Sequence, residues 1–315
     1  MKNKATLFVF SLSLMLAAGL LFSLQPMIGK QLLPRTGGSQ QVWNVAMAFF
    51  QIALLAGYLL THMLGRLSPR QHGIAYIALL VLAGIGFLPA LIPSDWAPSS
   101  TQNPAYSVLL VLVLQIAVPF ITLSLSAPTL QRLFSASRHD RADDPYFLYA
   151  ASNFGSFLGL LAYPLVIEPN LPVTAQAHYW QAGYWGLALL AATCLLFIPA
   201  RQQEKTITET ATASWHQRLR WLVLALVPSS LTLGVTTHIT TDLTPAPLLW
   251  VITLGLYLLS YIFAFARTGA RLRSINLQLY PVLAMVTALL ALINLNMPFA
   301  TILLALLAFF STALG

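Results

Sequence analysis

The sequence predicts an all-α protein built as a polytopic bundle of transmembrane helices. Hydrophobic residues make up 58% of the 315 residues and charged residues only 8%, whereas charged residues make up about a quarter of soluble domains. A soluble protein of this composition could not cover its surface with polar groups. Apolar runs of about twenty residues, the length that crosses a ~30 Å hydrocarbon core, also recur along the whole chain.

About ten spans are predicted, each an apolar run of about twenty residues. The first follows Lys2 and Lys4 as in a signal peptide, but its apolar stretch exceeds the roughly 7–15 residues of a cleaved signal, so an uncleaved anchor is predicted. Only "NLNMP" separates the last two runs. The predicted spans are 6–28, 42–64, 73–92, 105–126, 146–166, 179–198, 221–241, 246–266, 277–294 and 298–314.

The basic residues predict the orientation of these spans. On one side of the predicted topology, the N-terminus and alternate loops hold fourteen Lys and Arg residues, whereas the other side holds only Lys30 and Arg35. Cytoplasmic loops carry the excess of basic residues in multi-pass proteins. The expectation is a bacterial inner-membrane protein with a cytoplasmic N-terminus.

A long polar connection divides the chain into three predicted parts. Residues 1–198 form a first half of six helices, 199–220 a cytoplasmic linker, and 221–315 a second half. This layout is typical of a major-facilitator-like transporter with two six-helix halves. Only four spans follow the linker, and the chain stops inside the apolar run "LLALLAFFSTALG". We therefore expect a 6 + 4 arrangement with an incomplete second half, in a sequence that is part of a longer protein.

Several classes of function are disfavoured by the pattern. The net charge of +8 comes from short basic clusters between apolar runs, which does not indicate nucleic-acid binding. The single cysteine, Cys194, lies in an apolar run, and the six histidines have no metal-ligand spacing. The sequence shows no nucleophile–base pair and no phosphate-binding loop. We expect this chain by itself to be neither an enzyme nor a cofactor-binding protein.

The sparse charges on the predicted outer side are the first candidates for a site. Ionisable groups at span ends often pair or line a pathway. We hypothesise an outer-facing polar cavity between the two halves. The alternatives are a structural ion-pair set that holds the outer loops, and basic side chains that reach the lipid headgroups. The charged candidate substrate-binding residues are Lys30, Arg35, Glu168 and Asp242. The further polar candidates for the same cavity are Gln25, Asn44, Gln51 and His238.

Two further stretches are informative about helix packing. The span 221–241 is rich in Ser and Thr and contains Pro228 and Gly234, which is typical either of a cavity-lining helix or of hydroxyl-mediated packing. "ASNFGSFLG" has small residues at 151, 155 and 159, spaced four apart, which predicts close helix packing rather than substrate contact.

Three stretches together resemble a known family. They are "QPMIGKQLLPRTGGSQQVWN", "DDPYFLYAASNFGSFLGLLAYPLVIEP" and "VPSSLTLGVTTHITTDLTPAPLLW". They are similar to the N-terminal membrane part of bacterial fused major-facilitator/spermidine-synthase-like proteins, and the resemblance covers nearly the whole chain. In that family a cytoplasmic spermidine-synthase-like domain follows the membrane part. Here no strand–glycine turn–helix unit for such a domain is visible, so aminopropyltransferase activity would belong to an absent domain or a partner.

Two functions stay open at this point. The first is a protein of the lipid bilayer with transporter-like architecture that moves or senses a small polar solute, such as a polyamine. Carboxylates at 168 and 242 would suit a cation, whereas Lys30 and Arg35 would suit an anion or a zwitterion. The second is a non-transporting membrane anchor for a spermidine-synthase-like domain or partner.

Overall fold

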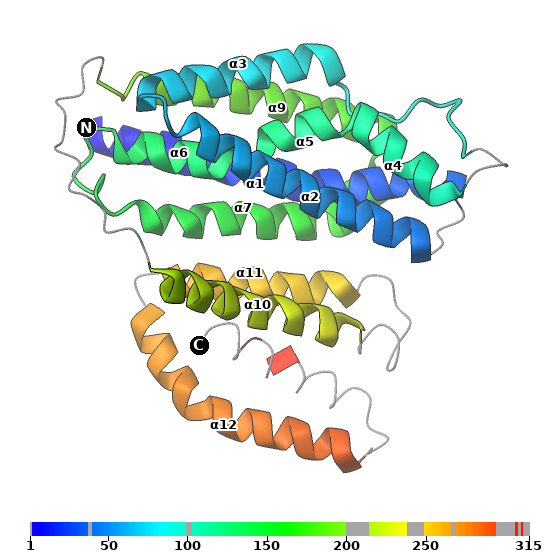
Figure 1. Ribbon diagram of the computed structural model, residues 1–315, viewed down its shortest axis with the longest axis vertical. Coiled ribbons are helices and arrows are strands. Elements are labelled where there is room, and N and C mark those ends of the chain that lie inside the picture. Colours follow the sequence, from blue (N-terminus) through cyan, green and yellow to red (C-terminus); the bar gives the residue numbers. More distant parts are fainter. Residues whose placement is uncertain are drawn as a thin grey trace. The chain divides into compact units, whose positions relative to one another are not determined.

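All regular elements in the described part of this computed structural model are helical, as the composition predicts (Figure 1). The structure describes residues 2–36, 40–98, 103–199, 214–237, 249–265, 269–293, 306–307 and 310. The elements are α1 (Lys2–Thr36), α2 (Gln40–Leu64), α3 (Pro69–Phe87), α4 (Pro104–Gln115), α5 (Ala117–Ser124), α6 (Ser126–Ser135), η1 (Pro145–Phe147), α7 (Leu148–Ala162), η2 (Tyr163–Ile167), α8 (Glu168–Asn170), α9 (Val173–Leu195), α10 (Trp215–Thr237), α11 (Leu249–Phe265) and α12 (Gly269–Ile293).

The chain divides into two compact units, Met1–Arg201 and Gln202–Gly315, and each is described by itself. Residues 215–220 of the predicted linker belong to α10, and residues 200–213 lie outside the described part of the chain. The division into a six-helix half and an incomplete half stays a prediction.

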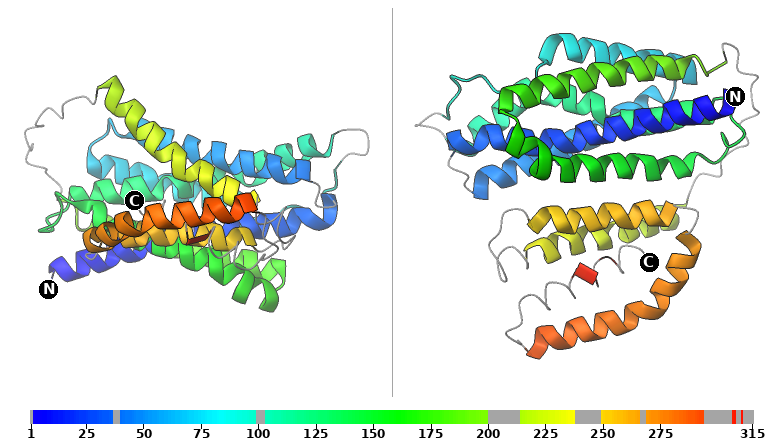
Figure 2. Two further views of the ribbon diagram at one scale, coloured as in Figure 1. Left: turned by 90° about the horizontal axis from the view of Figure 1, so that it is seen from below. Right: turned by 180° about the vertical axis from the view of Figure 1, so that it is seen from behind.

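Helix α1 is the centre of the first unit. It packs against α7, α9, α6, α5 and α2, and from behind it lies between α7 and α9 (Figure 2). Phe10, Leu14, Leu24 and Ile28 are fully buried along its length. A helix that is apolar on all sides is suited to this surrounded position, because it has no polar face to keep toward water.

The contact between α1 and α7 depends on glycine. A Cβ atom added to Gly155 would overlap the Met15 carbonyl, and one added to Gly159 would lie 2.6 Å from the Gly19 oxygen. Small residues four apart allow two helix backbones to approach this closely. The predicted packing role of "ASNFGSFLG" is confirmed.

Local sequence signals set several helix ends. Ser68 caps α3 in a reciprocal capping box with Gln71, and Pro69 occupies the first turn. The run predicted as one span at 105–126 is instead bent by 62° between α4 and the continuous helical stretch Ala117–Ser135. Pro119 explains the bend, because a proline ring clashes with the carbonyl four residues earlier and removes its hydrogen bond.

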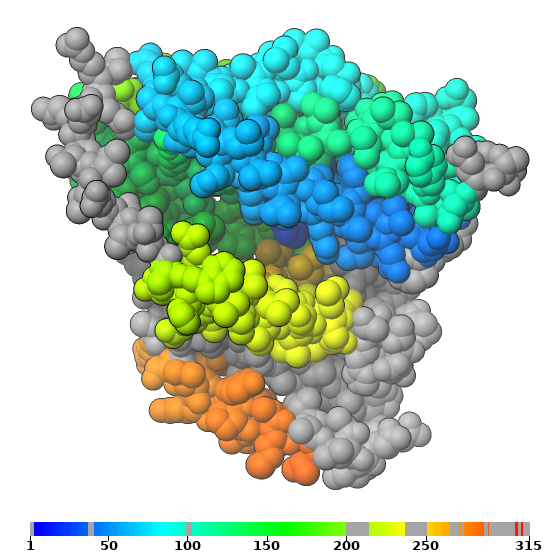
Figure 3. Space-filling view, in the orientation of Figure 1, coloured from blue at the N-terminus to red at the C-terminus, as the bar shows by residue number. Residues whose placement is uncertain are grey.

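Five helices are long and apolar enough to cross a membrane, or six if the bent pair counts as one span. Side chains of α2 lie across the visible face of the first unit (Figure 3). On this helix Ile52, Leu55 and Leu59 are each more than half exposed. Such apolar exposure suits lipid rather than water.

Helices α9, α11 and α12 overlap further predicted spans but are not among these five, and most of 298–314 lies outside the described residues. The ten-span topology stays a prediction. The five are Asn3–Thr36, Gln41–Leu64, Pro69–Phe87, Pro145–Asn170 and Trp215–Thr236.

In the second unit, α11 packs against both α10 and α12. The hydroxyls of Ser229 and Thr232 donate to carbonyls of their own helix, those of Ala225 and Pro228, at 2.8 and 2.7 Å. These bonds satisfy the hydroxyls within α10. They leave open whether the helix lines a cavity or packs against a neighbour.

Candidate functional site

The main charged site of the described residues is an ion pair between two distant segments of the first unit. Helix α1 continues to Thr36 despite Pro26 and Pro34, which places Lys30 on its last turns. Glu168 begins α8, directly after the π-helical turn η2. Lys30 Nζ lies 2.7 Å from Glu168 Oε1 and 3.4 Å from the Glu168 carbonyl oxygen. The two side chains are 34% and 44% exposed, so both stay accessible to a ligand.

The same end of α1 also holds the loop that follows α3. Gln31 is buried and donates from Nε2 to the Ala90 carbonyl at 3.3 Å, while its Oε1 accepts from the Ile92 amide at 2.8 Å. Arg35 donates to the Ile92 carbonyl at 3.5 Å. Three chain segments therefore meet here, and two of them are fixed to α1 by polar side chains. Sequence reasoning missed Gln31, whose only signal was an amide within an apolar stretch.

The structure brings together only some of the predicted site residues. Lys30 and Glu168 form the ion pair. Arg35 follows Lys30 closely in the sequence but contacts the loop after α3. Gln25, Asn44 and Gln51 are exposed residues of α1 and α2. His238 and Asp242 lie outside the described residues. A cavity between the two halves is therefore not tested, and it stays a hypothesis.

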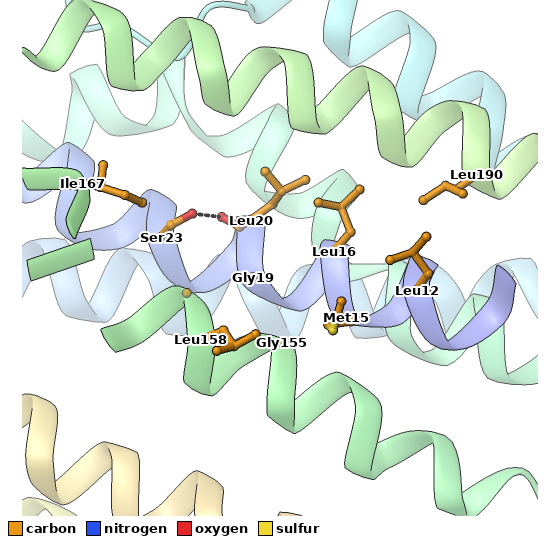
Figure 4. A pocket seen from close by; sticks show the side chains of 11 residues that line it. Leu12, Met15, Leu16, Gly19, Leu20, Ser23, Gly155, Leu158, Ile167 and Leu190 are labelled. Carbon is orange, nitrogen blue, oxygen red and sulfur yellow. Dashed lines mark hydrogen bonds between the residues drawn. The ribbon is translucent and has the colours of Figure 1, made fainter. Parts of the chain in front are cut away.

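An apolar groove runs along α1 toward this ion pair. It has a volume of about 340 Å³, with Leu158 of α7 on one wall and Leu190 of α9 on the other (Figure 4). A second groove of about 250 Å³ lies between α1, the η2 turn and α9. The two grooves share Leu16, Leu20, Ser23 and Ile167.

Three of the polar side chains that line the second groove are hydrogen-bonded within the protein. Tyr163 donates to Gln176 Oε1 at 3.0 Å, and Gln176 Nε2 donates to the Leu171 carbonyl at 2.8 Å. The indole of Trp180 donates to the Leu20 carbonyl at 2.9 Å. Because these groups already have hydrogen-bond partners in the protein, they do not require water. The second groove is therefore mainly apolar.

A second polar cluster lies at the opposite end of the bundle. The Arg132 guanidinium on α6 donates to the carbonyls of Leu64, Gly65 and Leu67, at 3.4, 2.9 and 2.7 Å, where α2 ends. It also donates to Nδ1 of the buried His72. Because a guanidinium only donates, Nε2 of that ring carries the hydrogen and donates to Thr129 Oγ1. The cluster joins α6 to the α2–α3 turn and is structural. No sequence spacing indicated it, because its members are about sixty residues apart.

The Lys30–Glu168 pair offers a ligand one cationic and one anionic group. In the described part of the chain, no three or more His, Cys, Asp or Glu residues gather as metal ligands. The Lys30 ammonium can donate to an anionic group, and the Glu168 carboxylate can accept from a cationic one. No known protein family, curated protein or solved structure matches this chain.

Proposed function

We propose that this chain is a multi-pass inner-membrane protein of transporter-like architecture that binds and moves a small polar solute bearing an amine, such as a polyamine. The observation that carries the proposal is the accessible Lys30–Glu168 pair at the end of α1. Ionisable groups are expensive beside hydrocarbon and usually mark a pathway or a binding site. The resemblance to the membrane part of the fused major-facilitator/spermidine-synthase-like proteins supports the choice of an amine.

The proposed topology has ten spans with the N-terminus in the cytoplasm. It rests on the uneven distribution of Lys and Arg, fourteen against two. The described helices overlap the first nine predicted runs, and five or six of them are long and apolar enough to span a membrane. Under this topology Lys30, Arg35 and Glu168 lie on the outer side, where a solute from outside the cell would first meet them.

The test is uptake of radiolabelled spermidine by cells or vesicles that contain the full chain. We expect Glu168→Gln to lower uptake about two- to fivefold, because a partly exposed ion pair contributes up to about 1 kcal/mol and 1.4 kcal/mol is a factor of ten. Asp242→Asn tests the other predicted carboxylate. Asp95→Asn, an exposed acidic residue in the loop after α3, is the matched control and should leave uptake unchanged.

Unchanged uptake in both Glu168→Gln and Asp242→Asn would contradict the solute site. Spermidine uptake absent from the wild type as well would favour the alternative, a non-transporting membrane anchor for a spermidine-synthase-like domain or partner. Equal protein levels in the membrane, measured by immunoblot, are required before the variants are compared.

A further inference from the structure

We infer that the two grooves over α1 form a lateral site for one acyl chain of a phospholipid whose headgroup, phosphoethanolamine, binds Lys30 and Glu168. This inference goes beyond solute transport and does not require it. The lipid amine and the solute amine would use the same carboxylate, so the lipid would compete with the solute at the end of α1.

The length of the combined groove suits a hydrocarbon chain. Four shared residues make the two grooves continuous, and their lining extends along α1 from Leu12 to Met27. At 1.5 Å per residue this is about 22 Å, enough for the ~15 Å depth of one bilayer leaflet, half of a ~30 Å core. A helix is 10–12 Å wide with its side chains, and one of this length would need well over ~1,000 Å³. A single chain fits grooves of about 340 and 250 Å³, whereas a helix does not.

The walls of the first groove are formed almost entirely by apolar side chains. The first groove is lined by leucines, glycines, Met15 and Ile167, with Ser23 as its one polar side chain (Figure 4). The Ser23 hydroxyl donates to the Leu20 carbonyl at 3.2 Å, so its hydrogen is used within α1. Water gains few hydrogen bonds along such walls, which favours an apolar occupant.

The ion pair lies where the groove ends. Met27 lines the second groove, and Lys30 is three residues further on the same face of α1. Ile167 lines both grooves and directly precedes Glu168. A lipid whose acyl chain lies in the groove would therefore have its headgroup beside the Lys30–Glu168 pair. The two side chains of this pair are 34% and 44% exposed.

The two signs of the pair select the headgroup. The phosphate of phosphatidylethanolamine would accept from the Lys30 ammonium, and its own ammonium would donate to the Glu168 carboxylate. Phosphatidylglycerol has no cation for Glu168. The quaternary amine of phosphatidylcholine has no N–H to donate. The arrangement thus favours a zwitterionic head with a primary amine over both.

The test uses the purified full chain in phosphatidylcholine vesicles that contain one of three photoactivatable probes. The probes share one diazirine-bearing acyl chain and differ only in an ethanolamine, glycerol or choline headgroup. We expect the ethanolamine probe to label peptides of α1, α7 and α9 about two- to fivefold more than the other two probes. This factor is the gain in affinity that one partly exposed ion pair provides.

Two variants and one control distinguish the contribution of the acyl chain to labelling from that of the headgroup. Ser23→Phe fills the junction of the grooves and should abolish this labelling, whereas Leu82→Phe, on a residue of α3 that is 67% exposed, should leave it unchanged. Glu168→Gln should lower ethanolamine labelling to the choline level, while choline labelling of the groove persists and shows that the protein is folded.

Equal labelling by the three probes, or a preference for the glycerol probe, would overturn the inference. So would groove labelling no stronger than that of exposed α3, or crosslinks from the groove to a second copy or to residues 215–293. The labelling requires no solute, so its failure would leave the uptake prediction standing, and failed uptake would leave the lipid site standing.

Discussion

At the residue scale, Arg132 is the side chain with the clearest structural role. Its guanidinium covers three carbonyls at the end of α2 and contacts the buried His72. We expect Arg132→Gln to destabilise the protein by about 1.5–3 kcal/mol, the range for hydrogen bonds to a charged group. Arg132→Lys should recover only part of this loss, because an ammonium cannot reproduce the planar fork.

The measurement is the thermal unfolding midpoint of the purified full chain in one detergent. Arg138→Gln is the matched control, since Arg138 is exposed shortly after α6, and it should change the midpoint little. A midpoint for Arg132→Gln equal to that of the control would show that the cluster contributes nothing to stability.

At the element scale, the α1–α7 contact gives the sharpest prediction. A Cβ at Gly155 would overlap the Met15 carbonyl. Because this group is part of the backbone, no change of side-chain rotamer can relieve the overlap. Gly155→Ala should therefore push the two helices apart and destabilise the protein by about 1–3 kcal/mol, as overpacking does. Gly186→Ala on α9 is the control, because its Cβ would lie 3.9 Å from the Leu16 side chain, an ordinary contact.

Both changes replace glycine by alanine within a helix, which by itself favours folding by about 0.5–1 kcal/mol. The difference between their unfolding midpoints isolates the α1–α7 contact. If Gly155→Ala raises the midpoint as much as Gly186→Ala does, the close approach of the two helices is not required.

The helices were the most predictable elements because a bilayer core forces a length and an apolar composition on each span. The described helices overlap the first nine predicted runs. The bend within 105–126 was missed, although Pro119 signals it. The η2 turn was missed as well, and Pro164 within it is the local signal.

At the scale of the whole molecule, the candidate site could be predicted only in part. The scarcity of outer-side charge indicated Lys30 and Glu168, because unpaired ions are costly at span ends. The bonds of Gln31 to the loop after α3 and the groove over α1 could not be predicted. They depend on which helices pack together, and apolar helices without a polar face carry little information about their neighbours.

Contacts within the first unit lead to the last prediction, which concerns orientation. At one end, Asn3 donates to Asp140 at 2.6 Å and Arg132 binds the α2–α3 turn, so the N-terminus and the segments 65–72 and 127–145 lie together. These segments hold seven of the nine Lys and Arg residues up to position 145. At the other end, Lys30 and Arg35 lie with Glu168 and Ile92.

Because basic residues stay on the cytoplasmic side, the end that holds Arg132 should face the cytoplasm. Alkaline phosphatase fused after residue 68 or within 199–220 should be inactive, and a fusion within 93–98 should be active, with a cytoplasm-active fluorescent protein giving the reverse. An active phosphatase in the 199–220 connection would invert the map. It would also place the Lys30–Glu168 pair where no external solute could reach it first.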